Sequence, residues 1–112
     1  METVWKFKIN PSSEIQTIEM PVWSHILYFG EDPNGELCIW AQVNPILECE
    51  PRTFYCIGTG WNMPEDYMWN WVGTARQGSY MWHLFEVTRF DETPDWTIEM
   101  INQSKGEIKF YE

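Results

Sequence analysis

The sequence is short of cations, of long apolar runs and of paired cysteine motifs. Four lysines and three arginines stand against 17 acidic residues in a chain of 112, and the net charge is −10. So few cations cannot form a broad basic face for duplex nucleic acid, and they disfavour binding to an anionic membrane surface. No run of about 18 apolar residues is present, so no transmembrane helix is expected.

Motifs for metal binding or nucleophilic catalysis are also missing. The three cysteines (Cys38, Cys49 and Cys56) are widely spaced without a CxxC pair, and His25 and His83 lie far from any such pair in sequence. The motifs GxSxG, HExxH and the EF-hand loop are all missing. We therefore expect no metal, no cofactor and no enzyme activity, with Cys38 and Cys56 as buried thiols inside strands.

Aromatic residues, in contrast, are abundant. The chain has eight tryptophans, five tyrosines and six phenylalanines. A domain of this size cannot bury so many rings, so some are expected at the surface or along a groove, where rigid, half-polar rings serve recognition. The acidic charge keeps such a surface soluble. This composition favours a binding protein over an enzyme.

Apolar and polar residues alternate with a period of two along most of the chain, which indicates half-buried strands. The expected strands are 3–9, 14–20, 22–30, 36–44, 52–58, 67–76 and 79–90. The sequence predicts a mainly β fold, a small antiparallel sheet, either curled or a sandwich, of about six to eight strands built from hairpins. At most one short helix is expected, a turn after Asp66. We expect one domain over 1–112, with a core of 3–90 and an extension of 91–112 that forms a hairpin or a helix.

The segment after the strand 52–58 combines glycines, rings and arginines. Backbone amides of a glycine turn, a threonine hydroxyl, stacking rings and guanidinium groups are the parts that a nucleotide pocket needs. A tight turn after a strand, and rings that fill the core or a subunit interface, are the alternatives. For His83 the alternatives are a general base and a packed residue. The candidate ligand-binding residues are Arg52, Gly58, Thr59, Gly60, Trp61, Tyr67, Trp69, Arg76 and His83.

Several segments in order resemble a family of small bacteriophage proteins of uncharacterised function. The pattern is WKF, IEMP, LCIWAQV, GTG, VGT and WHLFE, and it spans about residues 3–86. The chain departs from the family at Trp61-Asn62, where relatives carry His-Pro, and by its tail, 87–112. The resemblance implies a small accessory protein in the cytoplasm of an infected bacterial host. The N-terminus has no signal-peptide pattern, which by itself indicates a cytosolic location.

Two hypotheses for function follow. In the first, the protein is a counter-defence sponge that sequesters a small nucleotide signal of the cyclic dinucleotide type. Arg52 and Arg76 would bind phosphates, and Trp61, Tyr67 and Trp69 would stack on bases. In the second, its acidic surface mimics nucleic acid and blocks a basic host or defence protein. A homo-oligomer is expected, because both faces of the strand 67–76 are substantially apolar.

Overall fold

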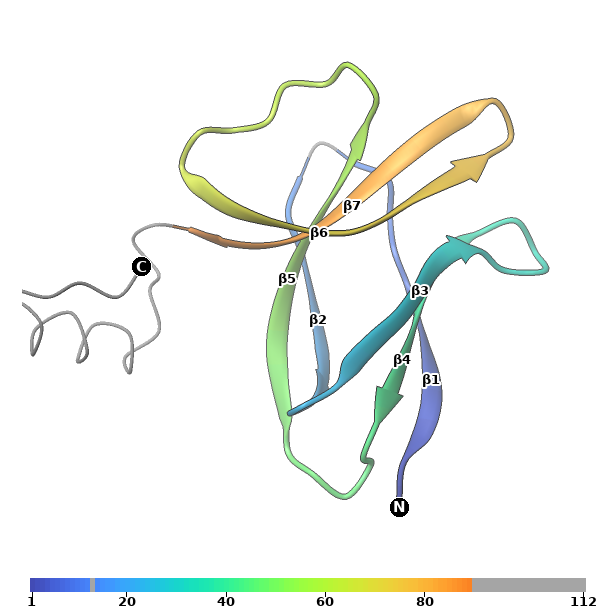
Figure 1. Ribbon diagram of the computed structural model, residues 1–112, viewed down its shortest axis with the longest axis vertical. Helices are drawn as coiled ribbons and strands as arrows, with labels where there is room; N and C mark the ends of the chain where they lie inside the picture. The colour runs from blue at the N-terminus through green and yellow to red at the C-terminus, as the bar shows by residue number, and fades with distance from the viewer. Residues whose placement is uncertain (13, 90–112) are drawn as a thin grey trace, which may run out of the picture.

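The computed structural model describes residues 1–12 and 14–89, which form seven strands in two antiparallel sheets (Figure 1). This confirms the mainly β prediction. The three-stranded sheet has the order β1 (Thr3–Lys8), β4 (Leu37–Val43), β3 (His25–Glu31). The four-stranded sheet has the order β2 (Gln16–Pro21), β5 (Cys49–Gly58), β7 (Tyr80–Arg89), β6 (Tyr67–Gln77).

The inner faces of the two sheets enclose the main core. In the smaller sheet, Phe7 and Phe29 both pair with Ile39, so one row of large apolar side chains crosses it. Phe54 and Leu84 come from the larger sheet and are fully buried. Because successive side chains of a strand point to opposite faces, the period-two pattern of the sequence places this set inward together.

Two hairpin turns lie in the gaps between the expected strands 22–30 and 36–44, and between 67–76 and 79–90. In the β3–β4 turn, Oδ1 of Asp32 accepts hydrogen bonds from the backbone N–H groups of Asn34 and Glu36, and Gly35 has a φ of 82°. The Lys6 ammonium donates to Asp32 at 2.9 Å, and this bond together with the Glu36 N–H lowers the pKa of Asp32 to about 2. In the β6–β7 turn, Gly78 has a φ of 59°. An L-residue with a side chain adopts such angles only at a cost.

A second apolar cluster lies on the other face of the larger sheet. Tyr55, Ile57 and Val87 are buried there, and Tyr67, Trp69 and Phe85 pack against them. The ring centroids of Tyr55 and Trp69 are 5.4 Å apart, as are those of Trp69 and Phe85. Both faces of the larger sheet therefore carry rings, which explains how a small domain accommodates many of them.

Three expectations about local structure were wrong in detail. The strand expected over 22–30 begins only at His25, because residues 22–24 form a turn in which Trp23 has a φ of 68° and the Ser24 N–H donates to the Pro21 carbonyl. β5 begins at Cys49, three residues before the expected start at Arg52, because it pairs along β2 from Pro21↔Cys49 onwards. No helical turn follows Asp66 in the described chain, since β6 begins at Tyr67. The expected hairpin or helix of 91–112 lies outside the described residues. Over residues 1–12 and 14–89, no helix is long and apolar enough to cross a membrane.

Candidate functional site

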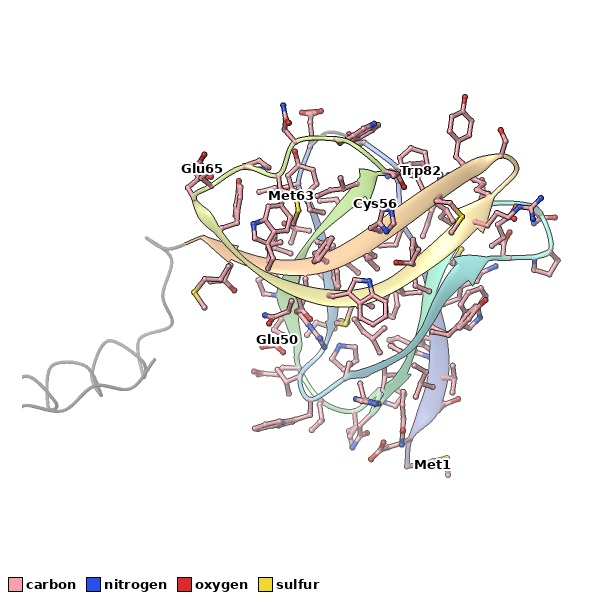
Figure 2. The ribbon with its side chains drawn as sticks, turned by 45° about the horizontal axis from the view of Figure 1, so that its top comes forward. Met1, Glu50, Cys56, Met63, Glu65 and Trp82 are labelled. Carbon is pink, nitrogen blue, oxygen red and sulfur yellow. The ribbon has the colours of Figure 1, made fainter. Side chains whose placement is uncertain are left out.

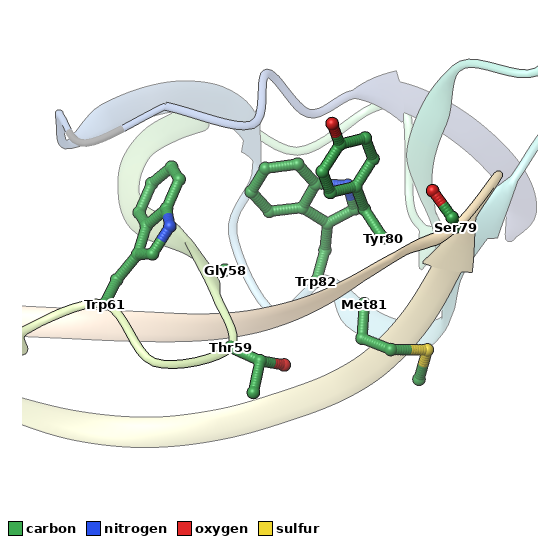
Figure 3. A pocket seen from close by; sticks show the side chains of 7 residues that line it. All are labelled: Gly58, Thr59, Trp61, Ser79, Tyr80, Met81 and Trp82. Carbon is green, nitrogen blue, oxygen red and sulfur yellow. The ribbon is translucent and has the colours of Figure 1, made fainter.

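A hollow opens where β5 stops short of its neighbour. The ladder between β5 and β7 ends at the pair Gly58↔Trp82, whereas β7 continues to Tyr80 and is paired there only with β6. The space that a longer β5 would fill is a pocket of about 430 Å³. We call it the aromatic pocket; it is lined by Gly58, Thr59, Trp61, Ser79, Tyr80, Met81 and Trp82 (Figure 3).

The glycines shape one wall of the aromatic pocket. The Trp61 N–H donates to the Gly58 carbonyl at 3.1 Å, which closes a β-turn, and Gly60 has a φ of 88° at its third position. That angle in that position is typical of a type II turn. The Trp61 ring lies so close to Gly58 that a Cβ there would sit 2.9 Å from it. The glycine turn therefore serves first to fold Trp61 back over the end of β5.

Three rings stand on one side of the β7 ribbon, while Thr59 and Met81 point to the other side (Figure 3). Trp61 meets Trp82 edge to face with centroids 5.4 Å apart, and Tyr80 lies 6.1 Å from Trp82 at a tilt of 33°. The Trp82 indole N–H donates to Gln77, whose amide N–H in turn donates to the Gly35 carbonyl of the β3–β4 turn. Trp82 is therefore a fixed platform, and Trp61 and Tyr80 are the more exposed rings beside it.

His83 lies behind Thr59 and is bound on both sides by hydroxyl groups. Its Nε2 is 2.7 Å from Oγ1 of Thr59, and its Nδ1 is 3.1 Å from Oγ1 of Thr74. The Trp71 indole N–H donates to the same Thr74 oxygen at 3.2 Å. Either imidazole tautomer satisfies both nitrogens, so the ring is held in place and fixes Thr59 on the side of β7 opposite the three rings.

Arg52, a candidate phosphate ligand, is held elsewhere. Its Nε and Nη2 donate to the two carboxylate oxygens of Glu86, each at 2.7 Å, and its Nη1 donates to the Ser24 carbonyl at 2.7 Å. The hydrogen bond to Glu86 raises the pKa of Arg52 further above its already high ordinary value. A second, shallower hollow of about 260 Å³ lies beside this ion pair, between His25 and Trp71. The structure does not bring Arg52 into the aromatic pocket.

The other candidates divide in the same way. Gly58, Thr59 and Trp61 line the aromatic pocket, and Gly60 shapes its turn. Tyr67 and Trp69 belong instead to the apolar cluster on the far face of the larger sheet. Arg76 pairs with the pocket residue Met81 in the β6–β7 ladder, so the two side chains lie on the same face of the sheet. The Arg76 Nε donates to the Gly78 carbonyl.

Sequence reasoning missed Ser79, Tyr80, Met81 and Trp82, which form more than half of the lining. Their alternation along the strand 79–90 is visible in the sequence. The sequence does not show at which residue of β7 the pairing with β5 stops. These residues lie beside an open space because β5 stops before it reaches them. Cross-strand register between segments far apart in the chain is set by packing, so no local pattern reveals it.

The described lysine, arginine and cysteine side chains do not line the aromatic pocket. Among the side chains that the structure describes, Lys6, Lys8 and Arg52 form ion pairs, whereas Arg76 does not. Cys38 and Cys56 are buried as free thiols, as expected, and burial raises the pKa of Cys56 to about 12. Within the described residues, no three His, Cys, Asp or Glu side chains are grouped to hold a metal ion.

Comparison with known families adds one finding. Residues 1–94 match the family model described as "Domain of unknown function (DUF7352)". Because the match covers most of the chain, the protein belongs to this family. No curated protein and no solved structure matches the chain. The family description states no activity, so the function has to be argued from the geometry of the site.

Proposed function

We propose that the protein is a non-enzymatic binding protein that sequesters a small nucleotide in the aromatic pocket. The supporting observation is one hollow of about 430 Å³ that combines three rings with the hydroxyl groups of Thr59, Ser79 and Tyr80. Pockets of about 300–1,000 Å³ with apolar rings and a few polar groups are typical of small-molecule sites. A nucleotide presents a flat base and polar edges that suit such a lining.

The rings account for binding of the base. Trp61 and Tyr80 are 43% and 67% exposed, so each has a face available without disturbing the core. Stacking of a base on an aromatic side chain contributes about 1–3 kcal/mol. Ser79, which lines the same hollow on the side of the rings, offers a hydroxyl group to the polar edge of the base (Figure 3).

Arg76 is the candidate partner for a phosphate group. It pairs with Met81 in the β6–β7 ladder, on the side of β7 opposite the three rings, so it would meet a phosphate group that extends past the end of β5 to that side. It forms no ion pair with a described carboxylate. A guanidinium suits phosphate because it can donate two parallel hydrogen bonds. One cation of this kind offsets locally the repulsion that a chain of net charge −10 exerts on an anion.

Binding without turnover is favoured by the chemistry of the lining. The described residues around the aromatic pocket carry hydroxyl, indole and thioether groups, with no carboxylate or thiol among them. In the bacteriophage setting that the resemblance implies, such a protein would lower the concentration of a host nucleotide signal. A cyclic dinucleotide has two bases, so a homo-oligomer with two aromatic pockets close together would suit it better than one chain.

Isothermal titration against a panel of mononucleotides and cyclic dinucleotides tests the proposal. We expect one ligand class to bind at about micromolar Kd, and Tyr80→Ala to weaken it at least about tenfold because one stacking face is lost. Tyr28→Ala is the matched control: Tyr28 is 62% exposed and lies 5.7 Å from Trp40, much as Tyr80 lies beside Trp82. Absence of binding across the panel, or equal losses in both variants, would refute the proposal.

A further inference from the structure

The turn between β2 and β3, residues 21–24, presents Trp23 to solvent. Trp23 is 88% exposed, more than any other described aromatic residue, and has a φ of 68°. The left-handed region costs a residue with a side chain about 1–2 kcal/mol, and bulky residues are rarely found there. The backbone at Trp23 is therefore strained, although the exposed indole buries almost no apolar surface that would stabilise the fold. Strained residues of this kind concentrate at functional sites.

Three groups hold this turn rigid. The Ser24 hydroxyl and backbone N–H both donate to the Pro21 carbonyl. The Ser24 carbonyl accepts from Arg52, which the Glu86 carboxylate clamps from the other side. A bidentate arginine–carboxylate pair is geometrically specific and strong. Arg52 thus braces the turn that carries Trp23.

A second turn, residues 44–48 between β4 and β5, is tied to the first. The Val22 N–H donates to the Glu48 carbonyl at 2.8 Å, and Pro21 pairs with Cys49 in the β2–β5 ladder. Both turns lie at the end of the molecule where the chain starts, away from the β5–β6 loop (Figure 1). Ile46 is 85% exposed here, and Asn44 accepts from the N–H groups of Ile46 and Leu47. We call residues 21–24 and 44–48 the paired turns.

The surroundings of the paired turns are acidic. Glu48 lies in the second turn itself, Glu50 pairs with Met20, and the exposed Glu19 precedes Met20 on β2. In Figure 2, Glu50 and Met1 lie toward the end opposite Trp82 and Met63. Arg52, a described guanidinium at this end, is engaged by Glu86. Two exposed apolar anchors with carboxylates in the same turn and at the adjoining end of β5 match a partner with an apolar pocket edged by lysines.

We propose that the paired turns dock onto a protein surface of that kind, with Trp23 and Ile46 inserted into its apolar pocket and Glu48 and Glu50 facing its basic rim. Tryptophan is enriched among the residues that dominate binding energy, and a preformed turn reduces the entropy lost on association. A second copy of the chain fits less well, because it would set carboxylates against carboxylates. This surface is separate from the aromatic pocket and does not depend on nucleotide binding.

Carbodiimide coupling tests the proposal, because it joins carboxylates to lysines that are already in ionic contact. The full chain is incubated with a soluble bacterial proteome, coupled, and analysed by mass spectrometry for the residues that are joined. We expect Glu48 or Glu50 to be joined to lysines of one partner protein. Trp23→Gly should reduce that product at least tenfold, whereas Tyr80→Ala, at the other end of the molecule, should leave it unchanged.

Trp23→Gly relieves the positive φ, so its melting temperature should stay close to the parent value or rise, and a loss of coupling cannot then be ascribed to unfolding. Ile46→Ser gives an independent check on the second anchor and should also reduce the product. Three outcomes overturn the proposal: no coupled partner, coupling that is equal in the parent and in Trp23→Gly, or coupling to a second copy of the chain.

Discussion

The aromatic pocket and the paired turns both expose tryptophan, but they expose it in opposite ways. In the aromatic pocket, Trp61 meets Trp82 at 5.4 Å and the two rings shape a hollow. At the paired turns, Trp23 projects from a tight turn and is 88% exposed. A hollow lined by rings can surround a small ligand, whereas a projecting ring can enter a pocket of another protein. If both proposals hold, the surplus of aromatic residues supports two different kinds of recognition.

The two regions also differ in what makes them rigid. Glycine and hydroxyl groups organise the aromatic pocket, through the turn at residues 58–61 and the bonds of His83 to Thr59 and Thr74. A half-buried ion pair, Arg52–Glu86, organises the paired turns. Neutral groups at the pocket can be altered at small cost to folding, whereas loss of one member of an ion pair leaves a poorly solvated charge. Substitutions should therefore have unequal effects at the two ends.

The largest effect is expected for Arg52→Ala. The change removes three hydrogen bonds and leaves Glu86, whose side chain is 29% exposed, without its partner. We expect the free energy of unfolding to fall by about 3 kcal/mol, measured by urea denaturation. Arg76→Ala is the control and should cost less than about 0.5 kcal/mol, because Arg76 is exposed. Similar small losses in both variants would mean that Arg52 is not a structural residue.

An intermediate effect is expected for Gly58→Ala. The new Cβ would lie 2.9 Å from the Trp61 ring, so the ring has to move away from the end of β5. Such crowding costs about 1–3 kcal/mol, and we expect the low end because a half-exposed side chain can shift. Trp61 fluorescence in a variant that lacks the other exposed tryptophans should move to longer wavelength. Gly60 is unsuitable as a control because its φ of 88° adds strain of its own, whereas Thr59→Ala leaves the backbone unchanged.

The sequence predicts the strands and turns better than it predicts the site. Asp32, Asn34 and Gly35 determine a turn locally, and the alternation around Phe54 and Leu84 shows which face of each strand is inward. Arg52 could not be assigned in the same way. Its partners, Ser24 and Glu86, are 28 and 34 residues away, and no local pattern reveals that they meet. The same reason hides Trp23, because its strain results from a turn that Arg52 braces.

The smallest effect is expected for Trp23→Gly, and a comparison with Trp71→Gly distinguishes backbone strain from side-chain packing at two exposed tryptophans. Trp23→Gly removes a positive φ and almost no burial, so the free energy of unfolding should stay within about 1 kcal/mol of the parent value, or rise. Trp71 is the matched site, 64% exposed but in the extended strand β6, where its indole N–H donates to Thr74. Trp71→Gly should cost about 1 kcal/mol or more, since glycine weakens a strand and a hydrogen bond is lost. Equal losses at both positions would show that the left-handed turn at Trp23 stores no strain, and that its exposure needs no partner to account for it.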